Sequence, residues 1–470
     1  MLHPSAAKEE GTVADEFLDL SAHEQVAALA AGTIGAVELT QAAIARIDAR
    51  DGAINAVVVR DFDRALVAAG EAEAAIARGE RRPLLGLPMT VKESHNVAGL
   101  PTTWGFEPFR NAVAGSDSLG VERLKAAGAI ILGKTNVPTW LADWQSVNPI
   151  YGRTNNPYDT GRSPGGSSGG SAAALAARMV ALEFGSDIGG SIRVPAAFCG
   201  VYGHKPSWQL IPGRGHVPPA GEPGAFPPLS VVGPMARTAR DLEIAMTVLA
   251  GPDSDMAAGY SLALREPRGK QLSDYRVLVV DAIGDLAIDP EVAGALSDLV
   301  DRLAMANVTI IRDTSILPDL AAARAAYGTM VTTITSARSG QPAAIDAHGW
   351  IEILNHQARF QRAFAAAFRQ VDIVLSPVFG TAAFPHNDAE PMKRVLSIGG
   401  EDSPYFGQIG WIAPATFGHL PATSAPIAQT AGGLPIGVQI IGPSLEDRTP
   451  IRFARLIEEA FGGYRAPAGY

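Results

Sequence analysis

Two glycine-rich segments stand close together in the sequence: SPGGSSGGS at residues 163–171 and GGSIR at residues 189–193. Glycines allow close backbone approach and positive φ angles, and hydroxyl groups placed among them can act as nucleophiles or proton carriers. A flexible linker is the simplest alternative. However, residues 172–177 favour a helix and residues 179–184 a short buried strand. The segments are therefore predicted to be loops held within a folded domain.

Two other loop functions are open at this point. A glycine loop that opens a helix can bind phosphate, but the Lys-[Ser/Thr] pair of a P-loop is absent. Residues 165–169 also satisfy G-x-S-x-G, the nucleophile elbow of α/β-hydrolases. That elbow directly follows a strand, whereas residues 153–162 carry turn signals. Spacing alone leaves His204, His216 and His386 open as partners of such a serine.

Composition restricts the class of protein. The 470 residues are 47% hydrophobic and 18% charged, which is typical of globular proteins with a large core. The net charge of −10 argues against nucleic acid or an anionic membrane as a partner and favours a small-molecule substrate. Cys199 is the single cysteine, so an internal disulfide and a cysteine-based zinc site are excluded. Neither a secretory signal nor a membrane-spanning apolar run is found, so we expect a cytoplasmic protein with a disordered segment at 1–15.

Short apolar runs alternate with helical patterns along the chain. Residues 21–50 are predicted to form a helix pair broken near Gly32, and further helices are expected from Thr238 to Gly251 and from Thr449 onward. Residues 206–235, rich in Pro and Gly, are expected to form a long loop over the sheet. The alternation predicts an α/β protein with a mostly buried sheet. The expected strands are 54–59, 87–91, 129–132, 179–184, 276–280, 308–311, 371–375 and 436–441.

The second glycine segment offers a different chemistry from the elbow. Ser191 could attack a carbonyl while Ser167 relays its proton, and successive N–H groups in a glycine turn can point at one developing oxyanion. A serine needs a base, and Lys92 at the end of the apolar run 87–91 would be partly desolvated, which lowers a lysine pKa. Lys134 and Lys205 follow similar segments, so position does not choose among the three lysines.

The sequence from Ser163 to Ser207 resembles the amidase signature family. The matching segments are GSDIGGSIRVPA at 185–196 and CGVYGHKPS at 199–207, with GLPMTVK at 86–92, KTN at 134–136, GP at 233–234 and GLPIGVQ at 433–439. The likeness spans about residues 21–463. It departs from the family at Glu93, where Asp is common, and at Thr139-Trp140, where an acidic residue is frequent.

The resemblance implies an amidase signature fold, with a large mixed β-sheet flanked by helices on both faces. It implies a Ser-(cis)Ser-Lys triad with Ser191 as nucleophile, Ser167 as relay with a cis peptide bond, and Lys92 as base. The backbone N–H groups of Ile188, Gly189, Gly190 and Ser191 would form the oxyanion hole. No cofactor or metal is implied. We expect a single amidase domain over 16–470, with a catalytic core at about 60–250 and a C-terminal part, 251–470, that completes the sheet and the pocket.

Other residues receive supporting interpretations. Asp187 and Arg193 are interpreted as a charge pair that braces the loop, and Ser168 as a hydrogen-bonding loop residue. Cys199 and His95 are expected to be structural. Four aromatic residues in or beside loops are candidates for lining the substrate pocket and favour a bulky or aryl amide substrate. They are Trp140, Trp144, Tyr151 and Trp208.

Two other functions fit the same sequence. One is the glutaminase subunit of a tRNA-dependent amidotransferase, which resembles the same family and works only with partner subunits. The other is a non-catalytic binding protein that retains the fold. The sequence also leaves a homodimer open. The predicted activity is hydrolysis of a carboxylic amide through an acyl-enzyme, with an ester or carbamate as a further substrate class.

Overall fold

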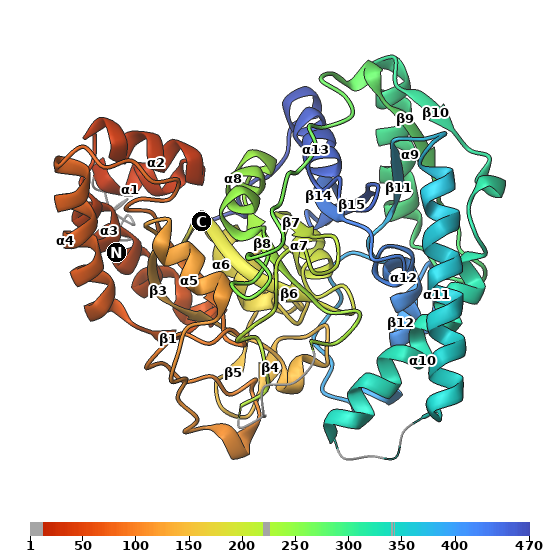
Figure 1. The fold of residues 1–470 in the computed structure, drawn as a ribbon, viewed down its shortest axis with the longest axis horizontal. Helices are drawn as coiled ribbons and strands as arrows, with labels where there is room; N and C mark the ends of the chain where they lie inside the picture. Colours follow the sequence, from red (N-terminus) through yellow and green to blue (C-terminus); the bar gives the residue numbers. More distant parts are fainter. Residues whose placement is uncertain (1–12, 220–225, 340–341, 343) are drawn as a thin grey trace, which may run out of the picture.

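A computed structural model describes residues 13–219, 226–339, 342 and 344–470 of the chain (Figure 1). Its centre is an eight-stranded sheet in the order β10-β9-β11-β15-β14-β7-β8-β6. The pairs β10–β9 and β9–β11 are parallel and the other pairs are antiparallel, so the sheet is mixed. The strands are β6 (Leu182–Asp187), β7 (Tyr202–Lys205), β8 (Val231–Ala236), β9 (Arg276–Val279), β10 (Thr309–Ile311), β11 (Ile373–Pro377), β14 (Ala422–Gln429) and β15 (Pro435–Ile441).

Helices cover both faces of this sheet. Because side chains alternate between the faces of a strand, Val277 and Val279 of β9 pack with α8, α9 and α13, whereas Leu278 packs with α10, α11 and α12 on the other face. Figure 1 shows α1 to α4 on one side of the molecule and α10 and α11 on the opposite side. The helices are α1 (Val13–Asp19), α2 (Ala22–Ala31), α3 (Ala36–Ile54), α4 (Phe62–Ala77), α5 (Leu119–Ala126), α6 (Gly169–Ala176), α7 (Arg193–Phe198), α8 (Ala239–Leu249), α9 (Pro290–Met305), α10 (Leu320–Ser339), α11 (Ala347–Ala367), α12 (Ile409–Phe417) and α13 (Arg448–Phe461).

A three-stranded sheet in the order β1-β3-β2 lies next to β6. Thr90 in the middle of β2 donates a hydrogen bond to the carboxylate of Glu183 near the start of β6, so the two strands lie side by side. Lys92 at the end of β2 contacts Ser186 within β6. The strands are β1 (Val57–Arg60), β2 (Pro88–Lys92) and β3 (Ile130–Thr135), and two short hairpins add β4 (Val147–Asn148) with β5 (Gly152–Arg153) and β12 (Val395–Ile398) with β13 (Glu401–Pro404).

Most predicted elements are confirmed. The predicted helix pair is α2 and α3, and the break falls at Gly32, which has a φ of 71° and ends α2. Thr238 caps α8 by accepting from the Asp241 N–H at 3.2 Å. The α/β class and the large mixed sheet with helices on both faces are as expected.

Four predictions at the level of elements were wrong. The strand expected at 179–184 begins only at Leu182 and continues to Asp187 as β6. The predicted loop 206–235 contains the start of β8, whose six residues are all buried, so no alternation marks it as a strand. Its residues 220–225 lie outside the described residues. The predicted strand 54–59 starts only at Val57, because α3 continues to Ile54. Of the segment expected to be disordered, 1–12 lies outside the described residues, whereas 13–15 open α1, where Asp15 pairs with Arg46 at 2.7 Å.

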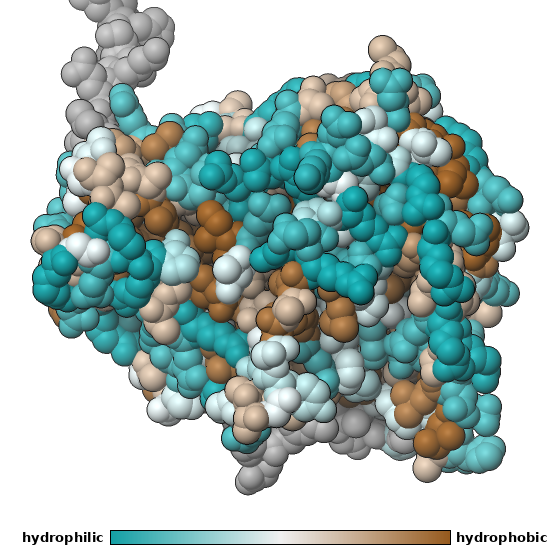
Figure 2. Space-filling model, turned by 45° about the horizontal axis from the view of Figure 1, so that its top comes forward, coloured by the Kyte–Doolittle hydropathy of each residue, from teal (hydrophilic) through white to brown (hydrophobic). Residues whose placement is uncertain are grey.

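One face of the molecule is largely hydrophilic (Figure 2). Hydrophilic side chains cover most of the face in Figure 2, and hydrophobic ones gather in small patches between them. Within the described ranges, no helix is both long and apolar enough to cross a membrane. Strands from residues 182–236 and from 276–441 share the central sheet.

Candidate active site

The three predicted triad residues come from three neighbouring segments. Lys92 is the last residue of β2, Ser167 lies in the loop before α6, and Ser191 lies between β6 and α7. The Ser168 N–H donates to the Ser191 carbonyl oxygen at 3.1 Å, which joins the two glycine-rich loops directly. The fold therefore brings together residues that are 75 and 24 positions apart in the sequence.

Lys92 is fully buried and surrounded by hydroxyl groups. Its Nζ donates to Ser167 Oγ at 2.6 Å and to Ser186 Oγ at 2.8 Å, and it lies 3.5 Å from the Ser186 carbonyl oxygen. Burial lowers the pKa of Lys92 to about 7, although the charges of Asp187, Glu183 and Glu93 oppose the shift. Lys92 is therefore largely neutral just above pH 7 and can act as a base.

Glycines allow the first loop to fit into its narrow space. The Gly166–Ser167 peptide bond is cis, and Gly165 has a φ of 83°. A Cβ on Gly166 would lie 2.3 Å from the Asp143 carbonyl oxygen, so residues 143–144 pack directly against Gly166. Ser168 Oγ lies 3.4 Å from the Ser186 carbonyl oxygen, a long contact within the predicted hydrogen-bonded loop.

Asp187 organises the second loop around one buried carboxylate. It accepts hydrogen bonds from the N–H groups of Gly190 at 2.9 Å and Ile192 at 3.1 Å and from the Arg193 side chain at 2.9 and 3.0 Å. Burial would raise the pKa of Asp187, but Arg193 and these donors hold it at about 2. The predicted charge pair is present, and neither partner is exposed.

The N–H groups near Ser191 are of two kinds. In the part of the chain that the structure describes, the N–H groups of Ile188, Gly189 and Ser191 have no acceptor, whereas that of Gly190 donates to Asp187. Three of the four predicted oxyanion donors are thus unoccupied. Ser191 is 5% exposed, and its Oγ has no hydrogen-bond partner in the described residues, which leaves it available for attack.

The four aromatic residues that were expected to line one pocket lie in different surroundings. Trp140 packs on Phe106 with ring centroids 4.6 Å apart, and Tyr151 lies with its hydroxyl 3.3 Å from Glu93. Trp144 is 4% exposed and donates from Nε1 to the Gly189 carbonyl oxygen at 2.9 Å. Trp208 stacks on His419 and borders a cavity of about 1120 Å³.

The three histidines that were open as partners of a nucleophile-elbow serine contact other residues. His204 lies 3.1 Å from Asp447, His216 lies 2.9 Å from Ser94, and His386 lies 3.0 Å from Asn155. None of these pairs includes Ser167 or Ser191, and no strand directly precedes the G-x-S-x-G segment, so the context of a nucleophile elbow is absent.

The remaining lysines and buried groups have structural contacts. Lys134 donates to Thr102 at 2.9 Å and Lys205 to the Pro206 carbonyl oxygen at 2.8 Å, and neither contacts Ser167. Cys199 is buried, which raises the pKa of its thiol far above the usual range and leaves it unreactive. His95 is buried and stacks on Phe184.

Sequence reasoning missed Ser186 and Tyr327. Ser186 contributes both its hydroxyl and its carbonyl oxygen to Lys92, and its place two residues after the apolar stretch ending at Phe184 gave no distinguishing signal. Tyr327 donates to the Ile188 carbonyl oxygen across 139 residues of sequence. No local pattern could have shown that contact.

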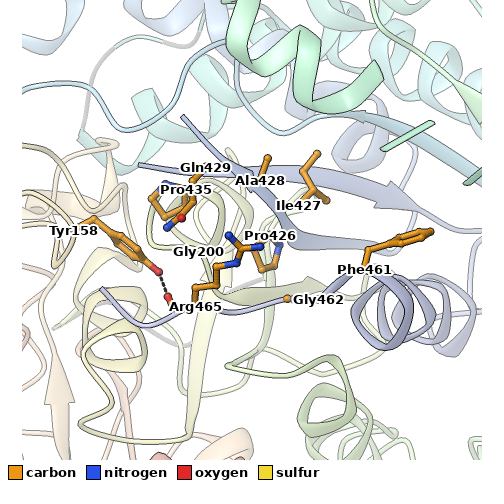
Figure 3. Close-up of a pocket in the computed structure, with 11 residues that line it drawn as sticks. Tyr158, Gly200, Pro426, Ile427, Ala428, Gln429, Pro435, Phe461, Gly462 and Arg465 are labelled. Atoms are coloured by element: carbon orange, nitrogen blue, oxygen red, sulfur yellow. Dashed lines mark hydrogen bonds between the residues drawn. The ribbon is translucent and has the colours of Figure 1, made fainter. Parts of the chain in front are cut away.

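A pocket away from the triad is shown in Figure 3. It lies between Tyr158, Pro435 and Arg465, and the Tyr158 hydroxyl donates to the Arg465 carbonyl oxygen. Its volume of about 20 Å³ holds a water-sized group at most, and no triad residue lines it.

Comparison with known proteins places the chain among amidases. The Amidase family model matches residues 38–347 and 332–450. The chain is 31% identical to a fatty-acid amide hydrolase 2-A of Danio rerio, over 97% of this chain and 91% of that protein. It is 32% identical to the glutamyl-tRNA(Gln) amidotransferase A subunit of Anaeromyxobacter sp. (strain K), over 97% and 99%. A solved bacterial aryl acylamidase of the amidase signature enzymes superposes with a TM-score of 0.82 at 26% identity, covering 96% of this chain and 99% of that one.

Proposed function

The chain belongs to the amidase signature family of amide hydrolases, and on this premise we propose that it hydrolyses a carboxylic amide through an acyl-enzyme at Ser191. Ser167 relays the proton and Lys92 is the base. The observation that carries this proposal is the 2.6 Å contact between Lys92 Nζ and Ser167 Oγ, made by a buried lysine whose pKa is lowered to about 7.

The surroundings of Lys92 suit a neutral amine. A neutral amine has two N–H donors and one lone pair. The Ser186 hydroxyl and carbonyl oxygens can take the two N–H groups, so the lone pair is left to face Ser167 Oγ. In this state the Ser167 hydroxyl donates its proton to Lys92 and can accept one from Ser191.

The proposed acylation adds one contact to this arrangement, between Ser191 Oγ and Ser167 Oγ. Lys92 takes the Ser167 proton, Ser167 takes the Ser191 proton, and Ser191 Oγ bonds to the amide carbon. The negative oxygen of the tetrahedral intermediate is held by the free N–H groups of Ile188, Gly189 and Ser191. The relay then returns the proton to the amide nitrogen, the C–N bond breaks and the amine leaves. Water hydrolyses the Ser191 ester by the same relay and releases the acid.

We propose a bulky or aryl amide as the substrate. Trp140 and Leu141 both have left-handed backbone conformations, with φ of 58° and 60°, which for non-glycine residues is often seen at functional sites. Trp140 belongs to a partly exposed aromatic cluster with Phe106 and Phe109. The following residues, 143–144, contact the Ser167 loop. The relatives named a fatty-acid amide hydrolase and an aryl acylamidase support the same class.

The nucleophile is tested by covalent labelling. A fluorophosphonate should label wild-type protein on Ser191, as located by mass spectrometry of the peptide, and should not label Ser191→Ala. Ser424→Ala is the matched control, because it removes a buried serine hydroxyl without a hydrogen-bond partner, and its labelling should equal wild type. Absence of labelling in wild type, or labelling at another residue, contradicts the mechanism.

The substrate class is tested by a hydrolysis screen over aliphatic, aryl and peptide amides, with Ser191→Ala as the blank. Trp140→Ala should lower kcat/KM for an aryl amide about tenfold, because it removes an apolar face worth ~1–3 kcal/mol, and should change short aliphatic amides little. Hydrolysis confined to short aliphatic amides contradicts the proposed substrate.

The second candidate is a glutaminase that works in a complex. It is favoured by the 32% identity to an amidotransferase A subunit over nearly the whole chain. Glutamine hydrolysis that appears only after adding co-purifying partner subunits would support it over the free-standing amidase. Hydrolysis of an aryl amide by the isolated chain, without activity on glutamine, would decide for the amidase.

A further inference from the structure

Two aromatic side chains hold the carbonyl groups of the loop before Ser191. The Tyr327 hydroxyl donates to the Ile188 carbonyl oxygen at 2.5 Å, and Trp144 Nε1 donates to the Gly189 carbonyl oxygen at 2.9 Å. Tyr327 lies on α10, in the C-terminal half of the chain, on the face of the sheet covered by α10 to α12. The loop is thus anchored from a distant element.

These anchors fix the directions of the neighbouring N–H groups. A peptide unit is planar, and in a trans unit the C=O and the next N–H point in opposite directions. Holding the Ile188 carbonyl therefore directs the Gly189 N–H, which has no acceptor among the described residues. Holding the Gly189 carbonyl directs the Gly190 N–H, but that group is also held by Asp187 at 2.9 Å.

The Gly189 N–H therefore depends on Tyr327 more than the Gly190 N–H depends on Trp144. The loop needs such an anchor because Gly189 and Gly190 lack the side chains that restrict rotation, and Gly190 has a φ of 85°. Tyr327 is fully buried, which raises the pKa of its phenol far above the usual range, so the hydroxyl remains a donor at any working pH.

We propose that Tyr327 is a positioning residue that aims the Gly189 N–H at the carbonyl oxygen of the reacting amide. The proposal rests on the acyl-enzyme function proposed above. It predicts a role in the chemical step, since the oxyanion forms only in the transition state, and little role in ground-state substrate binding.

Tyr327→Phe tests this by removing one hydroxyl. With a p-nitroanilide substrate, we expect kcat per fluorophosphonate-labelled site to fall about tenfold, less than the 10²–10³-fold seen when an oxyanion donor is itself removed. KM should change less than twofold, and the acid limb of the pH profile should not move, because Lys92 is untouched. Counting labelled sites removes the effect of any unfolded fraction.

Tyr275→Phe is the matched control. Tyr275 is also a fully buried tyrosine whose hydroxyl donates to a backbone carbonyl, that of Gly269 at 3.1 Å, and it lies in the cluster packed by α8, α9 and α13. Tyr275→Phe should lower the unfolding midpoint about as much as Tyr327→Phe does, and it should leave kcat per labelled site unchanged. A wild-type kcat per labelled site in Tyr327→Phe, or an equal loss in both variants, overturns the proposal.

Trp144→Phe provides the second variant if Tyr327→Phe does not fold. Since Asp187 still holds the Gly190 N–H, we expect kcat per labelled site to fall less than threefold. A loss of tenfold or more in kcat per labelled site of Trp144→Phe would contradict the proposal that Tyr327 contributes more than Trp144. If wild type hydrolyses no amide and carries no label on Ser191, the proposed function itself fails; if wild type passes both tests, only the inference on Tyr327 is at stake.

Discussion

Lys92 sets the pH range of the proposed chemistry. Burial lowers its pKa to about 7, and only the neutral amine can accept the Ser167 proton. We therefore expect kcat/KM to rise about tenfold per pH unit below pH 7 and to level off above it. Initial rates with a p-nitroanilide between pH 5 and 10 measure this profile, and an optimum near pH 5 would contradict it.

A second buried group provides a test of whether Lys92 controls the acid limb of the pH profile, which is the rise in kcat/KM below pH 7. Glu183 is one of the charges that oppose the lowered pKa of Lys92, and burial raises its own pKa to about 7. Glu183→Gln removes the negative charge, so the pKa of Lys92 should fall further and the acid limb of kcat/KM should move to lower pH. An acid limb that moves to higher pH would mean that Lys92 does not control it.

The neutral lysine also carries a cost in stability. The pKa of Lys92 is about 7 in the folded protein against the ordinary 10.5, so between these values the unfolded chain binds more protons and stability rises with pH. Methionine binds no proton, so in Lys92→Met position 92 no longer makes stability depend on pH. We expect the variant to be inactive, and its free energy of unfolding relative to wild type to decrease from pH 7 to pH 10 by about 3–4 kcal/mol.

Urea unfolding at pH 7 and pH 10 measures this difference. At pH 7, Lys92→Met gains less stability over wild type than the lowered pKa of Lys92 alone would give. The reason is that Met cannot replace the hydrogen bonds to Ser167 and Ser186, each worth about 1 kcal/mol. The pH dependence of the difference is the diagnostic quantity. Parallel stability curves for the two proteins would contradict a buried lysine with a lowered pKa.

At the level of elements, β8 shows how a glycine lets strands pack closely. A Cβ on Gly233 would lie 2.3 Å from the His204 carbonyl oxygen, which is backbone and cannot move aside cheaply. Gly233→Ala should therefore destabilise the protein by about 3 kcal/mol. Gly294→Ala is the control: this glycine lies exposed in α9, where a Cβ would meet nothing within 4 Å, so the variant should be about 1 kcal/mol more stable than wild type.

Denaturant midpoints of the two variants provide the comparison. A Gly233→Ala protein as stable as wild type would mean that β7 and β8 are farther apart than described. The same crowding explains why β8 escaped sequence analysis: its residues are buried on both faces, and Gly233-Pro234 is typical of a turn. The long helices with caps at Gly32 and Thr238 were predictable because their signals are local.

The candidate site divides in the same way between local and distant contacts. Motif spacing suggested Lys92, Ser167 and Ser191 as a set, but it could not show that Ser186 holds the lysine amine. The aromatic loop residues were treated as one pocket, whereas Trp144 is buried behind the Gly189 carbonyl and Trp208 stacks on His419. Such contacts depend on the packing of elements from different parts of the chain.

For the whole molecule, Arg193 connects the two halves of the chain at the active site. Its guanidinium donates to Asp187 in the first half and, in the second half, to Thr416 at 2.7 Å and Gln439 at 2.5 Å. The central sheet also joins the two halves of the chain, because β7 from the first half pairs with β14 from the second. A buried guanidinium that lost one set of partners would carry an uncompensated cost of several kcal/mol. We therefore propose that residues 16–470 form one domain.

Cleavage of the exposed segment that separates the halves tests this single domain. Residues 253–262 form neither helix nor strand, and Met256 and Tyr260 are 54% and 67% exposed. A protease cut there should leave the two fragments eluting together with activity retained, since the β7–β14 ladder and the Arg193 contacts hold across the cut. Calorimetry of the nicked protein should show one transition. Fragments that separate under native conditions and each unfold cooperatively would show two domains instead.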